Sequence, residues 1–520
     1  MIELVRGLDE AAFAFTMAPN REQLKRQDIV RHHILRGAAS ALEPFLERLA
    51  GDKGGVPWGP TSSQLSSLAD QYLASCGEMS AVLRAAMLER YGLAKATFYG
   101  SERVVLEVAS DAKDSEERVA GAWLSHSIRG RSTAEERQLA GRKNEIAHKI
   151  DRYVGIHNGW FIRYDSDDEL LGYHRRLASI YAAGTAEGRA LPREALLGGR
   201  PFCEWNESSI SAFGRVLHHV AFATRLKATA PSLELRNLLT IFARKDDVAE
   251  VLQEAGETPD GASRVMTGLT LDHGVAAACE RDFEIPLPYY VDFGRDFVLL
   301  PMFGGLLNAC AGLVWHLRRT YRKDWDRAVD GRERVFRDEL RALLASDRCI
   351  VPARGFRLRR ADGTELTDVD AVIADKTTGS LTLVQLKWPD IHGHSLAERN
   401  SRRINLLGAN EWVARVSDWI GGRSAREIAA VLGLPEAGDI PPAMLVLTRH
   451  AAQFAGEAGQ DTRAHWISWP SFVQLISASP GTGIFDLLSK PRAARDSSRP
   501  PQTAASIHRL PGLTVEIRTK

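Results

Sequence analysis

The stretch from Leu366 to Trp388 constrains the fold most, because two runs of apolar and β-branched residues flank a short polar segment. The first run, Asp368 to Ala374, and the second, Leu381 to Lys387, have the composition of β-strands. The segment between them, Asp375 to Ser380, is rich in turn formers and includes Gly379. This pattern predicts a β-hairpin.

The polar residues of this hairpin are expected to gather on one face. When the two end residues of the polar segment pair with each other, Asp370 lies opposite Gln385 and Asp368 lies opposite Lys387. Side chains alternate between the two faces of a strand, so all four project from the same side. A carboxylate, an amide oxygen and an ammonium group that converge in this way can hold a divalent cation and orient a water molecule beside it.

At these residues the chain resembles the PD-(D/E)XK (restriction endonuclease-like) nuclease superfamily, in which an Asp on one strand is followed on the next by an acidic residue, any residue and Lys. Asp370 and the triplet Gln385-Leu386-Lys387 match this arrangement. The Gln is similar to the variant in Mrr-like restriction endonucleases, where a neutral amide replaces the second acid. The resemblance implies that Asp370 and Gln385 bind Mg²⁺, with Mn²⁺ as a substitute, and that Lys387 orients the attacking water or stabilises charge on phosphate.

The resemblance covers roughly residues 326–490. This segment opens with an expected helix from Asp330 to Ala345, whose apolar residues recur at helical spacing. The superfamily often places a metal-binding or water-binding Glu on this helix, for which Glu333 is the first candidate and Glu339 the alternative. A surface ion pair of Glu333 with Arg337 at i+4 is the other interpretation of this residue.

The remaining elements of this segment follow on both sides of the hairpin. A first core strand is expected at Phe356 to Arg360. After the hairpin, Ser395 and Glu398 form a capping box that begins a helix ending near Ile420. Two closing strands and a short helix are then expected at Ala443 to Leu447, His465 to Trp469 and Phe472 to Ile476.

Three arginines on the helix after the hairpin are candidates for nucleic-acid binding. Arg399, Arg402 and Arg403 lie one turn apart, so they share a face. Guanidinium groups suit phosphate oxygens, and this face can run along a nucleic-acid backbone. Solvated helix arginines explain the same spacing without a function.

These patterns predict an α+β multidomain protein with a mostly helical N-terminal region. The resemblance implies that this region is followed by an α/β restriction-endonuclease-like domain with a central mixed sheet. We expect four parts: a helical region of unknown function at 1–199 with one strand at Ser101 to Ala109, a helical and β-hairpin middle region at 200–324, the nuclease-like domain at 325–490, and a flexible tail at 491–520 in which Gly512 to Thr519 can form one late strand.

Composition narrows the class of protein only slightly. The net charge of +1 over 520 residues excludes no partner, because a local basic groove can hide in a balanced total. The five cysteines are far apart and include no Cys-x-x-Cys pair, so neither a zinc site nor a disulfide scaffold is expected. The opening residues show no secretory signal pattern, which fits a reducing cytoplasm.

Two conspicuous features are expected to be structural. The run from Phe297 to Trp315 is nearly long enough to span a membrane, but Pro301, Asn308 and three glycines interrupt it, so a strand and a buried helix are preferred. The pairs His32-His33 and His218-His219 are interpreted as ordinary helix residues, because sequence neighbours point to different sides of a helix.

Taken with the resemblance, the sequence predicts a metal-dependent endonuclease that hydrolyses phosphodiester bonds, with DNA preferred over RNA as substrate. The resemblance and the architecture further imply a role in restriction or anti-phage defence, with a second copy or a defence-system protein as partner and no membrane association. The alternative is an inactive nuclease-fold module that binds nucleic acid or assembles a larger complex.

Overall fold

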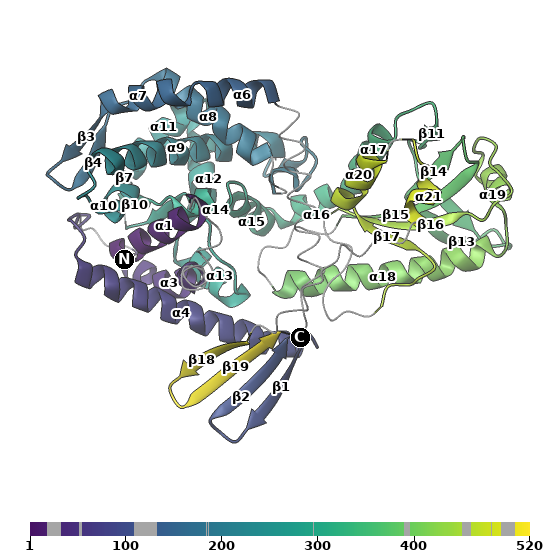
Figure 1. Ribbon diagram of the computed structural model, residues 1–520, viewed down its shortest axis with the longest axis horizontal. Coiled ribbons are helices and arrows are strands. Elements are labelled where there is room, and N and C mark those ends of the chain that lie inside the picture. Colours follow the sequence, from purple (N-terminus) through teal and green to yellow (C-terminus); the bar gives the residue numbers. More distant parts are fainter. Residues whose placement is uncertain are drawn as a thin grey trace. The chain divides into compact units, whose positions relative to one another are not determined.

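The structure of the chain is a computed structural model (Figure 1), which describes residues 1–17, 33–50, 55–108, 133–183, 185, 187–294, 296–388, 396–449, 459–479, 481–489 and 505–519. Its described residues form two compact units. The N-terminal unit consists mainly of Met1–Arg84 and the residues from 133 to Asp326. The C-terminal unit contains the rest, including residues 85–108 from the first part of the chain.

The N-terminal unit is mostly helical, with small sheets inserted between its helices. The helices of its described residues are α1 (Ile2–Met17), α3 (Ala38–Leu49), α4 (Ser63–Arg90, which continues into the other unit), α6 (Thr133–Gly141), α7 (Lys143–Tyr153), α8 (Asp168–Ala183), α9 (Phe202–Thr229), α10 (Leu235–Leu239), α11 (Lys245–Glu254), α12 (Pro259–Leu269), α13 (His273–Asp282), α14 (Phe303–Leu307), α15 (Ala311–Thr320) and α16 (Arg322–Asp330, which also continues into the other unit), with a 3₁₀ turn at Glu187–Arg189. One sheet has the order β7-β10-β9-β8, built from β7 (Ile241–Arg244), β8 (Thr270–Leu271), β9 (Tyr290–Asp292) and β10 (Phe297–Leu300). Two small hairpins pair β3 (Val154–His157) with β4 (Phe161–Tyr164) and β5 (Leu196–Leu197) with β6 (Arg200–Pro201).

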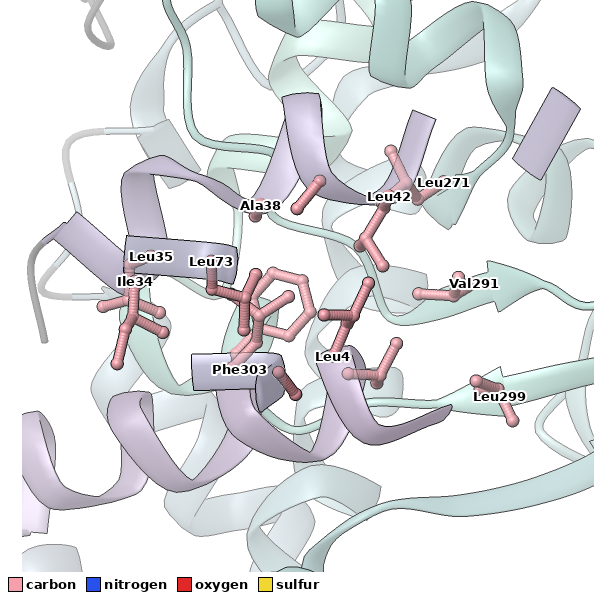
Figure 2. Close-up of a cluster of buried hydrophobic side chains, with 14 of the residues drawn as sticks. Leu4, Ile34, Leu35, Ala38, Leu42, Leu73, Leu271, Val291, Leu299 and Phe303 are labelled. Carbon is pink, nitrogen blue, oxygen red and sulfur yellow. The ribbon is translucent and has the colours of Figure 1, made fainter. Parts of the chain in front are cut away.

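A buried apolar cluster joins the first helices of this unit to its four-stranded sheet (Figure 2). Each element contributes side chains that are almost fully removed from water, namely Leu4 of α1, Leu42 of α3, Leu73 of α4, Val291 of β9 and Phe303 of α14. Burying side chains of this size is the main favourable contribution to folding. Segments that lie hundreds of residues apart in the sequence therefore share one core.

The run interpreted above as a strand and a buried helix has that form. The β-hairpin expected in the middle region is present as the antiparallel pair β9 and β10. After β10 the chain enters the short helix α14 and then α15, whose Leu313 and Leu317 are buried. Across the helices of the described residues, none combines the length and the apolar character needed to cross a membrane.

The expected structural role of the histidine pair on α9 agrees with its contacts. His219 accepts a hydrogen bond at Nδ1 from the Tyr164 hydroxyl and donates one from Nε2 to the carbonyl of Leu238, each 2.8 Å long. The Nδ1 atoms of His218 and His174 lie 3.1 Å apart. Both rings of the pair are buried, and these contacts belong to neutral imidazoles packed inside the protein.

We expect these histidines to make the protein less stable in acid. Burial lowers the pKa of His218 to about 3 and that of His219 to about 4, from an ordinary 6.5. Below pH 6.5 the unfolded chain therefore binds protons that the folded chain does not, and the free energy of unfolding falls, by about 2 kcal/mol per histidine at pH 5. Urea unfolding between pH 7.5 and 5 measures this loss.

The matched variants are His218→Leu and His157→Gln. The first removes one buried titrating group, and it should weaken the pH dependence of unfolding. The second alters an exposed histidine and should leave that dependence unchanged. A His218→Leu protein with the wild-type pH dependence would contradict the assignment.

The C-terminal unit contains a five-stranded mixed sheet between helices. The strand order is β11-β14-β15-β16-β17, where β11, β14 and β15 pair antiparallel and β15, β16 and β17 pair parallel. The elements are β11 (Cys349–Ile350), β12 (Phe356–Arg359), β13 (Glu365–Val369), β14 (Ala371–Asp375), β15 (Ser380–Lys387), β16 (Ala443–Thr448), β17 (His465–Ser468), α17 (Arg332–Leu343), α18 (Leu396–Ile420), α19 (Ala425–Leu432), α20 (Trp469–Ala478) and α21 (Ile484–Ser489).

The two faces of this sheet bury different helices. One face packs in an apolar cluster with α18 and α19, through residues such as Trp412 and Ile428. The other packs with α17 and α20, through residues such as Phe336 and Phe472. Strands β14, β15 and β16 are buried along almost their whole length because both of their faces are covered.

The expected hairpin is present with the expected register. Asp375 pairs with Ser380 at the turn, and the ladder continues to the pair Ala371 and Val384. In the turn, Asp375 accepts hydrogen bonds from the backbone N–H groups of Thr377 and Thr378, and Gly379 adopts a φ of +66°. Glycine adopts a positive φ more easily than other residues, so Gly379 helps to fix the position of the turn.

Two expectations about neighbouring strands were wrong. The strand expected first in the core, at Phe356 to Arg360, is β12, which pairs with β13 in a separate two-stranded sheet. The edge position in the main sheet belongs to β11 instead. The second error concerns Asp368, which lies in β13 opposite Arg357 rather than opposite Lys387, because the chain leaves the main sheet just before β14.

The end of the chain was also partly misassigned as a flexible tail. Residues 505–519 form the antiparallel pair β18 (Ala505–Leu510) and β19 (Leu513–Thr519), so only the single late strand expected near Thr519 was correct. β19 pairs in parallel with β2 (Arg103–Val108), the strand expected at Ser101 to Ala109, and β2 pairs with β1 (Ala94–Tyr99). The result is a four-stranded sheet made from two distant parts of the sequence.

Candidate metal centre

Asp370 lies at the junction of β13 and β14, and its carboxylate contacts the neighbouring strand β15. Its Oδ2 accepts a hydrogen bond of 2.7 Å from the backbone N–H of Leu386 and another from Nε2 of Gln385. Asp370 is 2% exposed and Gln385 is 6% exposed. The predicted neighbourhood of Asp370 and Gln385 is therefore present, and it is buried.

Three carboxylates, from α17, β13 and the junction between β13 and β14, meet at this point. Glu333 of α17, Asp368 of β13 and Asp370 each offer an oxygen, and these atoms lie within 4.8 Å of one another. Trp412 of α18 holds the Asp368 strand in place by donating a 2.7 Å hydrogen bond to its carbonyl. We call these three acids the carboxylate cluster; hard oxygen ligands at this separation fit Mg²⁺ or Mn²⁺.

The electrostatics of the cluster favour a cation. Burial, helped by the negative charges of Glu333 and Asp368, raises the pKa of Asp370 to about 7 against the opposing effects of the Leu386 N–H and Lys387. A buried carboxylate beside two others is costly to ionise unless positive charge is close. A bound divalent cation would supply that charge.

The cluster opens into a pocket of about 290 Å³. Cationic and aromatic side chains line the same pocket: Lys387 and Trp388 at the end of β15, Arg332 of α17, and Trp412 and Arg415 of α18. Acidic and basic groups thus face one small polar space. Such a space can place a metal ion against the acids and a phosphate group against the cations.

Sequence reasoning missed Arg332, Trp412 and Arg415. A signal existed on α18, because Gly408, Trp412 and Arg415 recur at i, i+4 and i+7 and so share one face. The arginines predicted for nucleic-acid binding, Arg399, Arg402 and Arg403, lie on the same helix, but their side chains lie outside the described residues. The capping residue Ser395 also lies outside them.

Both interpretations of Glu333 on α17 agree with its contacts, since it forms the ion pair with Arg337 and also belongs to the carboxylate cluster. Arg337 donates from Nη2 to the Glu333 carboxylate, which is the predicted i+4 ion pair, and from Nε to the backbone carbonyl of Asp370. Arg337 is buried. It therefore links the helix to the strand junction while Glu333 remains in the carboxylate cluster.

The alternative acid, Glu339, points to a different partner. Its carboxylate accepts hydrogen bonds from both terminal nitrogens of Arg449, one of them 3.1 Å long. In the described residues it is not part of the carboxylate cluster. The arrangement thus favours Glu333 over Glu339 as the third acid of the centre.

Comparison of the chain with protein-family models, with curated proteins and with solved structures found no match. The geometry and chemistry of its own residues therefore carry the functional inference.

The two glutamates can be separated by metal binding alone. Glu333→Gln removes a charge from the carboxylate cluster with little change of volume, and we expect Mg²⁺ or Mn²⁺ to bind on the order of tenfold or more weakly. Glu339→Gln should leave metal affinity unchanged, because it alters the contact with Arg449. Calorimetric titration of both variants with Mn²⁺ gives the measurement, and the reverse result would mean that α17 presents its other face to the centre.

Proposed function

We propose that the C-terminal unit is a magnesium-dependent nuclease that hydrolyses phosphodiester bonds, with DNA as its preferred substrate and a role in restriction or anti-phage defence. One observation carries this proposal: the carboxylate cluster and Lys387 line the same small pocket. Acids that hold a divalent metal beside a positioned ammonium are the groups that phosphodiester hydrolysis requires.

The order of elements supports assigning this unit to the restriction endonuclease-like fold. A helix, α17, precedes an antiparallel hairpin, and a long helix, α18, connects that hairpin to two further strands that pair in parallel. Asp370 on one side and the triplet Gln385-Leu386-Lys387 on the other lie at the open end of the hairpin, away from its turn.

Each residue has a defined role in the proposed reaction. Asp370, Asp368 and Glu333 would hold the metal, which would supply Lewis-acid chemistry for the phosphate and for the attacking water. Lys387 orients the attacking water or stabilises the charge that develops on the phosphate oxygens. Arg415 lies on the same pocket, and its guanidinium suits a neighbouring phosphate of the substrate. In this proposal Asp368 is a metal ligand, a role that the family resemblance implied for Gln385.

A second candidate function follows from the amide of Gln385. Its nitrogen, not its oxygen, faces Asp370, so in this arrangement Gln385 donates to the acid and is not poised to bind a cation. That contact favours a nuclease-fold module that binds nucleic acid or assembles a complex without hydrolysis. The nuclease mechanism proposed above does not use the Gln385 oxygen, because Asp368 supplies an oxygen ligand in its place.

The experiment compares cleavage with binding in the full chain. Supercoiled DNA, linear DNA and RNA are incubated with the protein in Mg²⁺, Mn²⁺ or EDTA, and binding is measured in parallel. We expect metal-dependent cleavage that EDTA abolishes. Binding without cleavage across these substrates would favour the inactive module, and cleavage in EDTA would rule out the metal-dependent mechanism.

A further inference from the structure

Three parallel strands of the main sheet end in register, and the next residue of each is large. Lys387 pairs with Thr448, and Thr448 pairs with Ser468. The residues that follow, Trp388, Arg449 and Trp469, therefore leave the sheet side by side. The backbone N–H of Arg449 extends the ladder by donating a 2.7 Å hydrogen bond to the carbonyl of Lys387.

The guanidinium of Arg449 lies among aromatic rings at this edge. Its central carbon is 4.4 Å from the ring centre of Trp388, 5.8 Å from that of Trp469 and 5.3 Å from that of Phe336 on α17. Arg449 is 7% exposed. A planar guanidinium attracts aromatic faces most strongly where water is excluded, so these contacts favour one fixed position for the side chain.

The same guanidinium binds the carboxylate of Glu339 with both terminal nitrogens. Glu339 and Phe336 lie on α17, the helix that also carries Glu333 of the carboxylate cluster. Through its backbone Arg449 contacts Lys387, and through its side chain it contacts α17. It therefore connects the two elements that bring an acid and an ammonium to the pocket.

We propose that Arg449 is a positioning residue that sets the place of Lys387 and Trp388 relative to Glu333. The effect of Arg449 on the rate of cleavage rests on the proposed nuclease function. Arg449 does not line the pocket, so its effect is transmitted through the strand end and through α17. Small displacements of a catalytic group reduce the rate of the chemical step more than they reduce substrate binding.

The test compares Arg449→Met and Arg449→Lys with wild type in the full chain. Arg449→Met keeps an unbranched apolar stem and removes the planar cation. We expect kcat to fall about 10- to 100-fold with KM for DNA nearly unchanged. Arg449→Lys keeps the charge without the planar fork, so it should recover only part of the rate. A raised KM at unchanged kcat would instead make Arg449 a substrate contact and overturn the proposal.

Arg348 provides a matched structural control. It forms an ion pair of 2.8 Å with the buried Asp375 at the opposite end of β14, near the hairpin turn. Arg348→Met should destabilise the same sheet and leave kcat of the folded protein unchanged. Equal losses of kcat in Arg348→Met and Arg449→Met would mean that Arg449 acts only through stability. If Arg449→Met does not fold, Glu339→Gln tests the same link, with an expected smaller loss of kcat.

A second measurement separates this proposal from the proposed function. The rate at which acetic anhydride modifies Lys387 is compared by mass spectrometry with that of Lys376, which is exposed in the turn of the same hairpin. We expect Arg449→Met to change the rate at Lys387 at least severalfold and to leave Lys376 unaffected. An unchanged rate at Lys387 overturns the positioning role, whether or not the protein cleaves DNA; a wild type that cleaves nothing overturns only the proposed function.

Discussion

Replacing Asp370 with asparagine is expected to abolish metal-dependent cleavage and to remove metal binding at the carboxylate cluster. The change keeps the size of the side chain and removes the charge that the metal needs. We also expect the variant to be more stable than wild type, by on the order of 1 kcal/mol, because a carboxylate buried beside Glu333 and Asp368 is unfavourable without a cation. Cleavage assays, Mn²⁺ titration and urea unfolding test the three parts.

The control for this variant is Asp338→Asn on α17. Asp338 is exposed and forms an i+3 ion pair of 3.3 Å with Arg341, so its replacement should leave cleavage and metal binding unchanged. An Asp370→Asn protein that still cleaves at the wild-type rate would exclude the proposed centre. A variant that loses both folding and activity would show that Asp370 serves the fold.

Lys387→Ala should lower the rate of cleavage by a factor on the order of 10²–10³, the usual cost of losing one well-placed group that stabilises developing charge. Metal binding should persist, because all three acids remain. Binding of DNA should largely survive as well, since phosphate contacts are spread over many groups. Single-turnover cleavage and parallel binding measurements separate these effects.

Lys376→Ala serves as the control for Lys387→Ala, because it removes the same charge from the exposed turn of the same hairpin. It should cleave at the wild-type rate. A wild-type rate in Lys387→Ala would contradict the assigned role of the ammonium.

The hairpin could be predicted from the sequence because its information is local. Two strand-forming runs around a short polar turn predict a hairpin, and pairing Asp375 with Ser380 then determines which residues face each other. The approach of Asp370 to Gln385 follows from that register. The prediction failed at Asp368, because the chain leaves the sheet at Asp370 and no turn residue marks that change of direction.

The partners of the charged side chains could not be predicted in the same way. Arg337 and Arg449 look like ordinary charged residues at helical or loop positions, yet both are buried against groups that are far away in sequence. Helical spacing alone left Glu333 and Glu339 as alternatives, since both neighbour apolar positions of α17. The choice between them depends on what each carboxylate contacts across the fold.

The sheet formed by β1, β2, β19 and β18 has a consequence for how the protein is made. Its central parallel pair joins β2 to β19, and Arg103 of one strand forms a 2.6 Å ion pair with Glu516 of the other. A ribosome delivers β2 roughly four hundred residues before β19. During that interval β2 has an unpaired edge, which is a template for aggregation. We therefore expect chains that terminate early to be far more prone to aggregation than the completed protein.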